Sequence, residues 1–479
     1  MSISFFSFVH IVVLSGIYLY SHSFRQFYIS NVILLYFFEI VNVQGYFIKL
    51  GNGEYYFDII QLYLVFLLSL IMLIRNFSGR TKLVYAALSF LGITLLSTLY
   101  QGIFPYDGYI MPAELTMNCS WDTYVEGKSV LYRYTFDFLQ NMNLYKRVCM
   151  YVVVIYTMKI NISNADIYSI LKKLISFSSI IVLYGYFEML MKNVLNRPME
   201  MYKFNEFLFG KTESSYTWEN ASVMLDGSYR LQGFTSEPSQ YVFSLLIFSV
   251  VILMAIKYQR LSNILTPRWY YIELILILIL MPMTGGMSSI WCIFSLLLSY
   301  MIVNKYGDFS FSKAFYFGVF FFVGIGLFFF FIEYLLDNSN SLLIERFFGS
   351  LETISFLFSN PNILFVTGMD GSTLARFTSI IVCIGNWFDN PFLGLGFGIT
   401  KAHSFTVSML VGNGLLGCIT WYYFITTSGR GYKKYDHLLL IIIFFIEFIP
   451  IGALGGWYTY TYLLLLAEAT ALYRSIKLS

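Results

Sequence analysis

Thirteen blocks of mostly apolar residues, typically about 15 to 20 residues long, follow one another along the chain. They occupy residues 3–20, 29–44, 56–74, 83–101, 147–158, 174–191, 240–256, 270–283, 287–303, 314–332, 404–425, 438–453 and 457–473. A helix needs about 20 apolar residues to cross the hydrocarbon of a bilayer. The pattern therefore predicts an all-α fold, a polytopic transmembrane helical bundle of about 12–13 helices in a single integral membrane domain over residues 1–479.

Two other interpretations of the apolar blocks are disfavoured. The strands of a membrane barrel alternate apolar and polar residues, and the run from Ile272 to Met281 does not alternate. A signal peptide ends in a small-residue cleavage site, and none follows Tyr20. The first block is therefore expected to be the first membrane helix.

Composition excludes a soluble enzyme, because only 12% of the residues are charged and 58% are hydrophobic, whereas soluble domains carry about 25% charged residues. The net charge is +3 and the basic residues are dispersed, so no nucleic-acid partner is expected. Five single cysteines without a C-x-x-C spacing favour neither a zinc site nor a disulfide framework. We expect no metal and no cofactor.

Lysine and arginine divide the connecting segments into two sets. Six segments hold sixteen basic and three acidic residues: 75–82, 159–173, 257–268, 304–313, 430–436 and 474–477. The segments 102–145, 192–237 and 334–400 hold nine basic and sixteen acidic residues. Because short cytoplasmic loops retain basic residues, the first set and the C-terminus are predicted inside, and 102–145, 192–237 and 334–403 are predicted to be outer loops. Thirteen helices would place the N-terminus outside; one helix fewer would return it inside.

The third outer loop carries two recognisable features. Residues 372–390 have apolar side chains at three- and four-residue spacing, which predicts an amphipathic helix on the outer leaflet. We expect Ser372 or Thr373 to cap it and Pro391 to end it. Three glycines at alternate positions then precede His403, and such glycines permit a tight turn or the close approach of a ligand. Gly414 and Gly417 are small residues that allow another helix to pack closely.

A third motif ends the second outer loop. It reads Tyr229-Arg-Leu-Gln-Gly-Phe-Thr-Ser-Glu-Pro-Ser-Gln240, and it stops where a membrane helix begins. Together with Arg376…Asn390-Pro-x-x-Gly-x-Gly-x-Gly…His403-Ser-x9-Gly-x-x-Gly, it resembles the O-antigen polymerase and O-antigen ligase superfamily. The motifs that carry this resemblance cover residues 225–425.

The resemblance implies a metal-independent, inverting glycosyltransferase in the bacterial cytoplasmic membrane, with its site facing outward. The donor would be a polyprenyl-diphosphate-linked oligosaccharide and the acceptor a glycan. A membrane protein that regulates chain length would be a further partner. By position, Arg230 and Arg376 would contact the diphosphate and His403 would be the catalytic base. The family's further arginine is missing at Met283-Thr-Gly-Gly-Met-Ser-Ser, so Arg346 is a loose substitute; Ser404 is a further candidate.

The residue types suit this chemistry. Arginine binds phosphate oxygens through a planar fork that stays charged, and histidine has a pKa near the working pH of a general base. Glu237 would orient an arginine or replace His403 as base; the alternative is a first-turn acid that the helix dipole favours. Arg376 and Arg230 have structural alternatives, in which they bind lipid phosphates or anchor a loop. Membrane acids are functional candidates by default, here Glu39, Glu188, Glu273, Glu447 and Glu468; Trp218, Tyr229 and Trp387 are candidates for stacking on sugars.

Three functions remain open from the sequence. A polymerase would join lipid-linked repeat units into an O-antigen, capsule or exopolysaccharide. A ligase would move the glycan to a lipid or protein acceptor with the same donor chemistry. A lipid-linked oligosaccharide transporter would show interrupted helices and midplane charges. The polymerase is favoured by the Thr235-Ser-Glu-Pro-Ser segment.

Overall fold

A computed structural model describes most of the chain up to Thr427. The described residues are 2–41, 43, 46–50, 53–75, 81–110, 124–126, 129–133, 138–161, 164–210, 229–235, 238–261, 264–284, 288–290, 292–294, 296–297, 316, 319–321, 323–327, 371–397, 400, 402 and 404–427. The chain divides into two compact units. Unit 1 comprises 1–68, 163–347 and 468–479, and unit 2 comprises 69–162 and 348–467.

The described residues are mostly helical, as predicted, and five helices are long and apolar enough to cross a membrane. These five spans are Phe24–Val41, Phe57–Arg75, Lys82–Ile103, Ser169–Val194 and Thr406–Ile425. The blocks 438–453 and 457–473 lie outside the described residues, and only parts of 287–303 and 314–332 are described. The total of 12–13 helices therefore stays a prediction.

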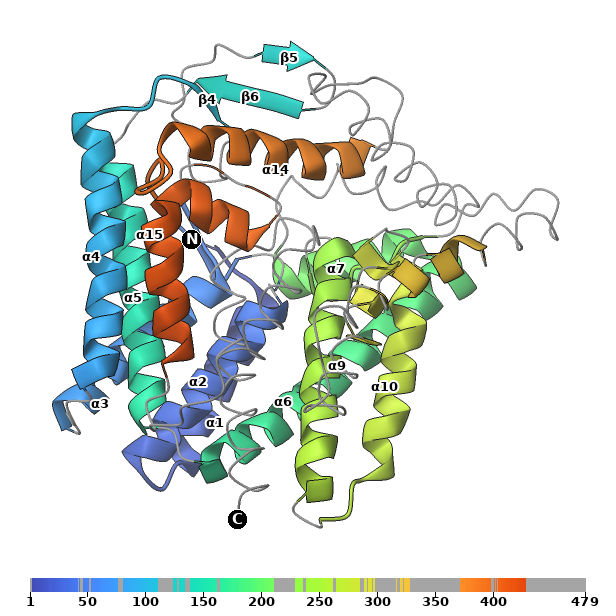
Figure 1. Cartoon of the computed structure of the whole chain (residues 1–479). Helices are drawn as coiled ribbons and strands as arrows, with labels where there is room; N and C mark the ends of the chain where they lie inside the picture. Colours follow the sequence, from blue (N-terminus) through green and yellow to red (C-terminus); the bar gives the residue numbers. More distant parts are fainter. Residues whose placement is uncertain are drawn as a thin grey trace. The chain divides into compact units, whose positions relative to one another are not determined.

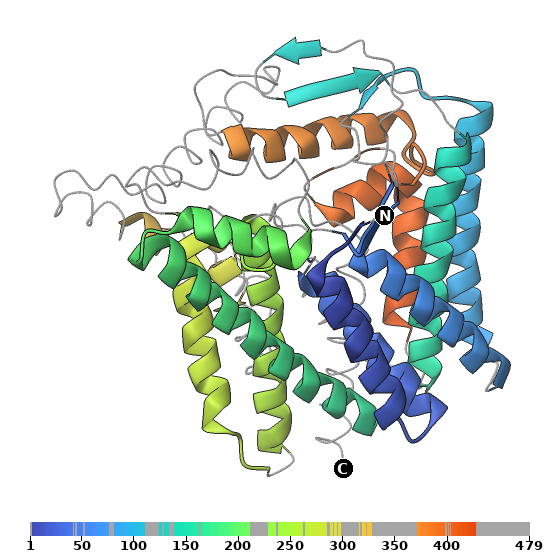
Figure 2. The same cartoon turned by 180° about the vertical axis from the view of Figure 1, so that it is seen from behind.

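Unit 1 is built around two helices that are buried on nearly every side, α2 (Phe24–Val41) and α9 (Pro238–Leu261). They pack against α6 (Asn164–Met189), which crosses the unit obliquely and is drawn in teal in Figure 2. Helix α10 (Arg268–Leu280) lies alongside α9 (Figure 1), and α1 (Phe5–Tyr20) lies against α2. The burial of α2 and α9 explains why their apolar residues show no helical periodicity.

The two ends of unit 1 hold different segments. At one end, Val43 after α2 pairs with Thr235 before α9, and Ser7 in the first turn of α1 donates to the Phe47 carbonyl at 2.5 Å. At the other end, Arg25 in the first turns of α2 pairs with Asp166 at the start of α6. The described part of segment 192–237 and the start of α6 thus lie at opposite ends of unit 1.

Three local structures in the connections differ from the all-α, loop-only prediction. One small antiparallel sheet contains β1 (Ser2–Ile3), β2 (Ile48–Leu50) and β3 (Gly53–Tyr55), and another contains β4 (Tyr109–Ile110), β6 (Ser129–Arg133) and β5 (Tyr124–Glu126). Segment 192–237 contains the helix α7 (Pro198–Phe209), which begins at a proline and ends at Gly210 with φ 63°. The strands are two to five residues long, too short for a periodic signal.

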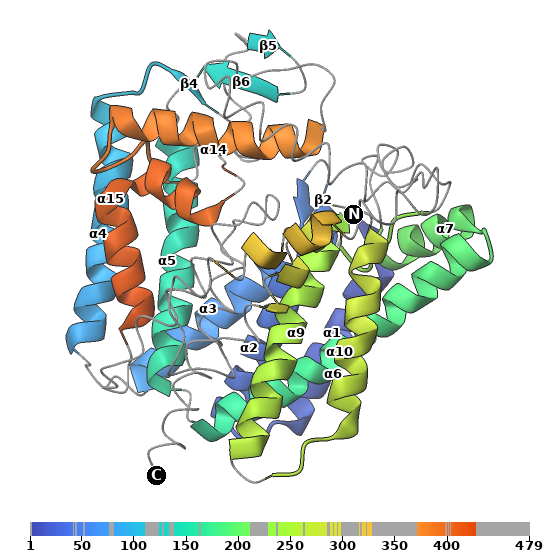
Figure 3. The ribbon, with the colours of Figure 1, turned by 45° about the vertical axis from the view of Figure 1, so that its right-hand side comes forward.

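Unit 2 contains α4 (Thr81–Ile103), α5 (Phe138–Asn161), α14 (Gly371–Asp389) and α15 (Phe405–Thr426). Helix α15 packs along α4, where Phe90 lies 4.8 Å from the Trp421 ring between centroids, and α4 also contacts α5. Helix α14 runs across one end of these helices, between α15 and β4 (Figure 3). Helix α3 (Phe57–Arg75) continues from unit 1 into unit 2.

Outward faces of the long helices carry large apolar side chains. Leu67 and Ile74 on α3, Leu88 on α4 and Ile419 on α15 are exposed in the isolated chain. Faces of this kind suit contact with lipid, because soluble monomers rarely expose large contiguous apolar surfaces.

Lys159 closes the other end of unit 2. Its Nζ donates to the carbonyls of Phe424, Ile425 and Thr427 at 3.0, 2.5 and 2.9 Å. These carbonyls end α15 and have no intrahelical partner of their own. A lysine near a helix C-terminus satisfies them and balances the helix dipole. One of the basic residues of segment 159–173, Lys159, therefore binds the end of α15 within the protein.

We expect Lys159→Met to lower the free energy of unfolding by at least the roughly 1.5–3 kcal/mol that one hydrogen bond to a charged group contributes. Thermal unfolding of the purified protein in detergent measures the change. Lys172→Met removes an exposed lysine from α6 and should stay within about 0.5 kcal/mol of the unaltered protein. Equal unfolding temperatures for both variants would contradict this role of Lys159.

Candidate functional site

Five of the six candidate residues have the following outcomes in the structure, and the sixth, Ser404, caps α15. Arg230 is described and half-buried in unit 1. Arg376 lies on α14 of unit 2, as predicted, but its side chain is outside the described part. Glu237, Arg346 and His403 lie outside the described residues. Since Arg230 and Arg376 belong to different units, their convergence on one cavity stays a prediction.

The loop 229–235 that carries Arg230 docks on the turn that follows α10. Helix α10 stops at Leu280 and is followed by the 3-10 turn η3 (Pro282–Thr284). Leu231 N donates to the Met283 carbonyl at 3.2 Å, and Arg230 Nε donates to the Thr284 carbonyl at 2.7 Å. The second bond fixes the plane of the guanidinium, as the loop-anchoring interpretation expects. These carbonyls belong to Met283-Thr-Gly-Gly, where the resemblance led us to look for an arginine.

A second set of contacts holds the same loop from α6. This helix continues into a π-helical turn, η1 (Leu190–Val194). The Asn193 side chain bonds both backbone groups of Tyr229, accepting from its N–H at 2.6 Å and donating to its carbonyl at 2.9 Å. The Glu188 carboxylate accepts the N–H of Gly233 at 2.7 Å and that of Gln232 at 3.2 Å. The residues from 229 to 233 are therefore all fixed.

Glu188 also pairs with Lys192, and both side chains are 0% exposed, with 2.6 Å between Nζ and Oε1. Gly233 has φ 58°, and a Cβ there would lie 2.4 Å from the Tyr241 ring. Glycine thus allows two successive N–H groups to face one carboxylate. The sequence indicated Glu188 only as one of several membrane acids. The sequence did not indicate a role for Lys192 or Asn193, because polar residues are ordinary directly after the end of an apolar block.

The other membrane acids have separate outcomes. Glu273 on α10 is buried and accepts from the hydroxyls of Ser178 and of Ser179, the latter at 3.1 Å. Glu39 is buried on α2. Glu447 and Glu468 lie outside the described residues. Glu273 is thus hydrogen-bonded to two serines of α6, and neither of them belongs to the loop 229–235.

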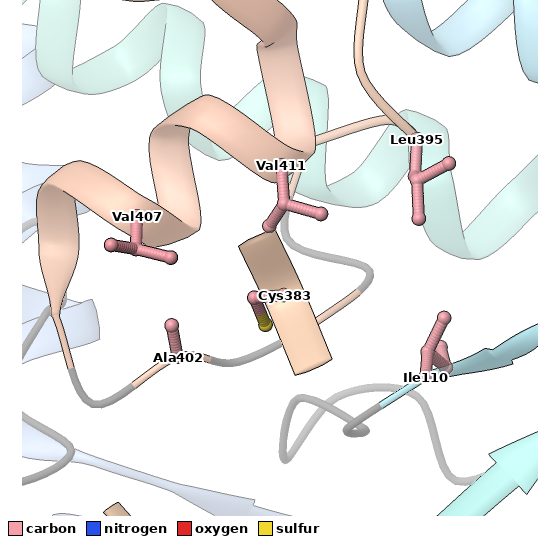
Figure 4. Packing of buried hydrophobic residues seen from close by; sticks show 6 residues of the cluster. All are labelled: Ile110, Cys383, Leu395, Ala402, Val407 and Val411. Atoms are coloured by element: carbon pink, nitrogen blue, oxygen red, sulfur yellow. The ribbon is translucent and has the colours of Figure 1, made fainter. Parts of the chain in front are cut away.

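Helix α14 forms over Gly371–Asp389, which confirms the predicted amphipathic helix. Ser372 and Thr373 lie inside its first turn rather than before it. Its buried side packs in a cluster formed by Ile110, Cys383, Leu395, Ala402, Val407 and Val411 (Figure 4). Burial raises the pKa of the Cys383 thiol to about 12. Trp387 packs on this cluster and donates to the Pro391 carbonyl at 2.8 Å, so its contacts within the protein are structural.

Tyr106 ties the connection after α4 to the C-terminal turn of α14. Its hydroxyl lies 3.1 Å from Asn386 Oδ1 and 3.0 Å from Asp389 Oδ2. Desolvation and the neighbouring Asp389 carboxylate raise the pKa of Tyr106 well above its ordinary value. The hydroxyl therefore stays protonated and donates at neutral pH.

Helix α15 is broken at Gly414, which has φ 65° and ψ −171°. The loop after α14 fills this break. Leu395 N and Gly396 N donate to the carbonyls of Val411 and Gly412 at 2.7 and 2.8 Å. In return, Leu415 N and Leu416 N donate to the carbonyls of Pro391 and Phe392 at 2.9 and 3.2 Å. Four backbone groups that the break releases are thus paired with the loop 391–396.

The glycines of the motif serve this contact. A Cβ at Gly394 would lie 2.5 Å from the Val411 carbonyl oxygen, and one at Gly414 would lie 2.2 Å from the Phe392 carbonyl group. Gly394 has φ 68° and its N–H donates to the Asn390 carbonyl at 2.9 Å, which is the expected turn, and the group that approaches it closely is the chain's own backbone. Gly414 breaks its helix, where we expected helix packing; a Cβ on Gly417 would meet Asn413 of the same helix at 2.1 Å.

Side chains complete the hydrogen bonds of the break. Ser97 Oγ on α4 donates to the Gly412 carbonyl at 2.9 Å. Gln101 Nε2 on α4 and Asn390 Nδ2 both donate to the Gly394 carbonyl, at 3.2 and 2.7 Å. The carbonyls of Val411, Gly412 and Gly394 are therefore already occupied by donors of the protein.

The residues on either side of His403 are fixed to α15. Ser408 Oγ bonds both backbone groups of Ala402 at 3.1 Å. Ser404 is the N-cap of α15, since its hydroxyl accepts the Val407 N–H at 3.4 Å. That role explains the buried Ser404 hydroxyl without a substrate. Among the described residues, no group of three or more His, Cys, Asp or Glu side chains is arranged to hold a metal ion.

No protein-family model, curated protein or solved structure matches the chain.

We expect Gly394→Ala and Gly414→Ala to open the contact between α15 and the loop 391–396, and Cys383 can report it. In a variant that keeps only this cysteine, the buried thiol with its raised pKa should resist N-ethylmaleimide at neutral pH. Each alanine should speed the reaction at least roughly tenfold, since about 1.4 kcal/mol of strain shifts an opening equilibrium by that factor.

The matched control is Gly385→Ala, because a Cβ at Gly385 on α14 meets nothing within 4 Å. This variant should react as slowly as the unaltered protein. If all three glycine variants modify Cys383 at one rate, the loop does not depend on close approach at Gly394 and Gly414.

Proposed function

We propose that the chain polymerises lipid-linked oligosaccharide repeat units into a surface polysaccharide on the outer face of the cytoplasmic membrane. The observation that carries the proposal is the fixed loop of Arg230. Its guanidinium is half-buried, and its Nε is bound to the Thr284 carbonyl at 2.7 Å. An arginine oriented before the substrate arrives can stabilise charge that develops on a diphosphate without further reorganisation.

The proposed reaction is a single displacement at the anomeric carbon of the donor's reducing-end sugar. The acceptor hydroxyl gives its proton to His403 and forms the new glycosidic bond. The bond to the diphosphate breaks, and polyprenyl diphosphate leaves with the electron pair. Arg230 and Arg376 balance the charge on its oxygens. Glu237 orients an arginine or serves as the base in place of His403.

Helix α14 supports the placement of this site near lipid. It lies across one end of the unit 2 helices and exposes Phe388, while Phe392 is exposed in the following loop. Such a helix, carrying Arg376, suits the boundary between hydrocarbon and headgroups. A polyprenyl-linked donor presents its diphosphate at that level. The resemblance also implies a membrane protein that regulates chain length as a partner.

Two alternative functions, a ligase and a transporter, are supported by some of the same observations as the polymerase. A ligase would use the same arginines and differ in its acceptor. A transporter is favoured by the interruption in α15, because transporters bind ions with the carbonyls of unwound helices. In this chain, however, the carbonyls of Val411 and Gly412 accept bonds from Leu395, Gly396 and Ser97. This occupancy argues for a structural break.

The test is a transfer assay with the purified protein in lipid nanodiscs, the lipid-linked repeat unit of the producing cells and a metal chelator. The unaltered protein should form a ladder of longer lipid-linked glycans. Arg230→Ala and Arg376→Ala should each lower kcat about 10²–10³-fold, and His403→Ala about 10²–10⁴-fold.

Arg260→Ala and His22→Ala are the matched controls. Arg260 lies in the last turn of α9 and bonds the Tyr271 hydroxyl, and His22 is exposed between α1 and α2. Neither control should lose transfer. Glycan found only on another acceptor would identify a ligase. Transbilayer movement without transfer, unchanged by the substitutions, would overturn the enzyme proposal.

A further inference from the structure

The Glu188–Lys192 ion pair is buried at a cost that the fold must offset. Moving two charges from water into a protein interior costs several kcal/mol per ion, and mutual attraction balances this only with good geometry and further hydrogen bonds. Here the Nζ–Oε1 distance is 2.6 Å and both side chains are 0% exposed. The further bonds go to Gln232 N and Gly233 N. The Glu188 carboxylate thus also accepts hydrogen bonds from the Arg230 loop.

Lys192 adds a contact of its own. Its Nζ lies 5.2 Å from the centroid of the Tyr202 ring on α7, within the range of a cation–π interaction. The ammonium therefore joins the end of α6 to α7 while it neutralises Glu188. Both partners of the pair are held by groups outside the pair.

The π-helical turn gives these residues a common direction. Glu188, Lys192 and Asn193 are four and five residues apart across the end of α6 and η1. Glu188 bonds the loop after Arg230, and Asn193 bonds Tyr229 before it. π-Helical turns are frequently found at functional sites. The end of α6 and η1 thus bonds the backbone both before and after Arg230.

We propose that the Glu188–Lys192 pair is the positioning device that aims Arg230 at the donor diphosphate; this rests on the proposed function. Glu188 holds the N–H groups of Gln232 and Gly233, and the ion pair with Lys192 holds the Glu188 carboxylate in place. Neither touches the substrate. Loss of the pair releases residues 232–233, so the Arg230 guanidinium loses its orientation in the transition state.

The test uses the neutral double variant Glu188→Gln/Lys192→Met, because either single change leaves a buried charge without its partner. We expect kcat per folded molecule to fall roughly 10–100-fold, the range that misplacing a reacting group costs. In an Arg230→Ala background the double variant should cause no further loss, since coupled sites are not additive. Backbone exchange of residues 232–233 should accelerate roughly tenfold or more as the loop opens.

Glu273→Gln is the matched control, because it neutralises another buried carboxylate of unit 1, which bonds Ser178 and Ser179. It should change neither transfer nor exchange of residues 232–233. Losses that multiply in the Arg230→Ala background would overturn the proposal, as would faster exchange with unchanged transfer. If the unaltered protein transfers no glycan, the proposed function fails and the positioning role fails with it. Accelerated exchange would then report a structural ion pair alone.

Discussion

A backbone N–H or C=O group that lacks a partner in hydrocarbon costs several kcal/mol, and unit 2 is organised around this constraint. The break at Gly414 releases donors and acceptors in the middle of an apolar helix. The loop 391–396 satisfies four of them, and Ser97 and Gln101 of α4 donate to the carbonyls of Gly412 and Gly394. The position of α14, which precedes this loop, follows from the same bonds.

Unit 1 solves a related problem with different residues. The interruption after α10 leaves the Met283 and Thr284 carbonyls facing the loop 229–235, which supplies Leu231 N and Arg230 Nε. In unit 1 a segment that the sequence singled out for chemistry thus bonds the turn after a helix, and in unit 2 such a segment fills a broken helix. Arg230, which is proposed to act on substrate, is carried by backbone that is hydrogen-bonded on both sides.

The sequence predicted what periodicity and length encode. Helices such as α4 were predicted because an apolar run of that length is typical of a membrane helix. Helix α14 was predicted because its apolar and polar residues fall on different faces. Helix α7 and the short strands were not, because two to twelve residues give little periodic signal. The Glu188–Lys192 pair joins residues to a loop 44 positions away, a contact that no local pattern encodes. The glycines were found, but their partner, the chain's own backbone, became visible only in three dimensions.

The contacts of α4 have a consequence for biosynthesis. Ser97 and Gln101 bond residues 315 and 293 positions later in the chain. At about 5–20 residues per second, ribosomes need roughly 15–60 s to make that intervening chain. During this interval α4 has already left the ribosome while two of its polar side chains lack their final acceptors. A nascent chain that ends before residue 391 lacks both acceptors, so Ser97 and Gln101 of α4 stay without their native partners.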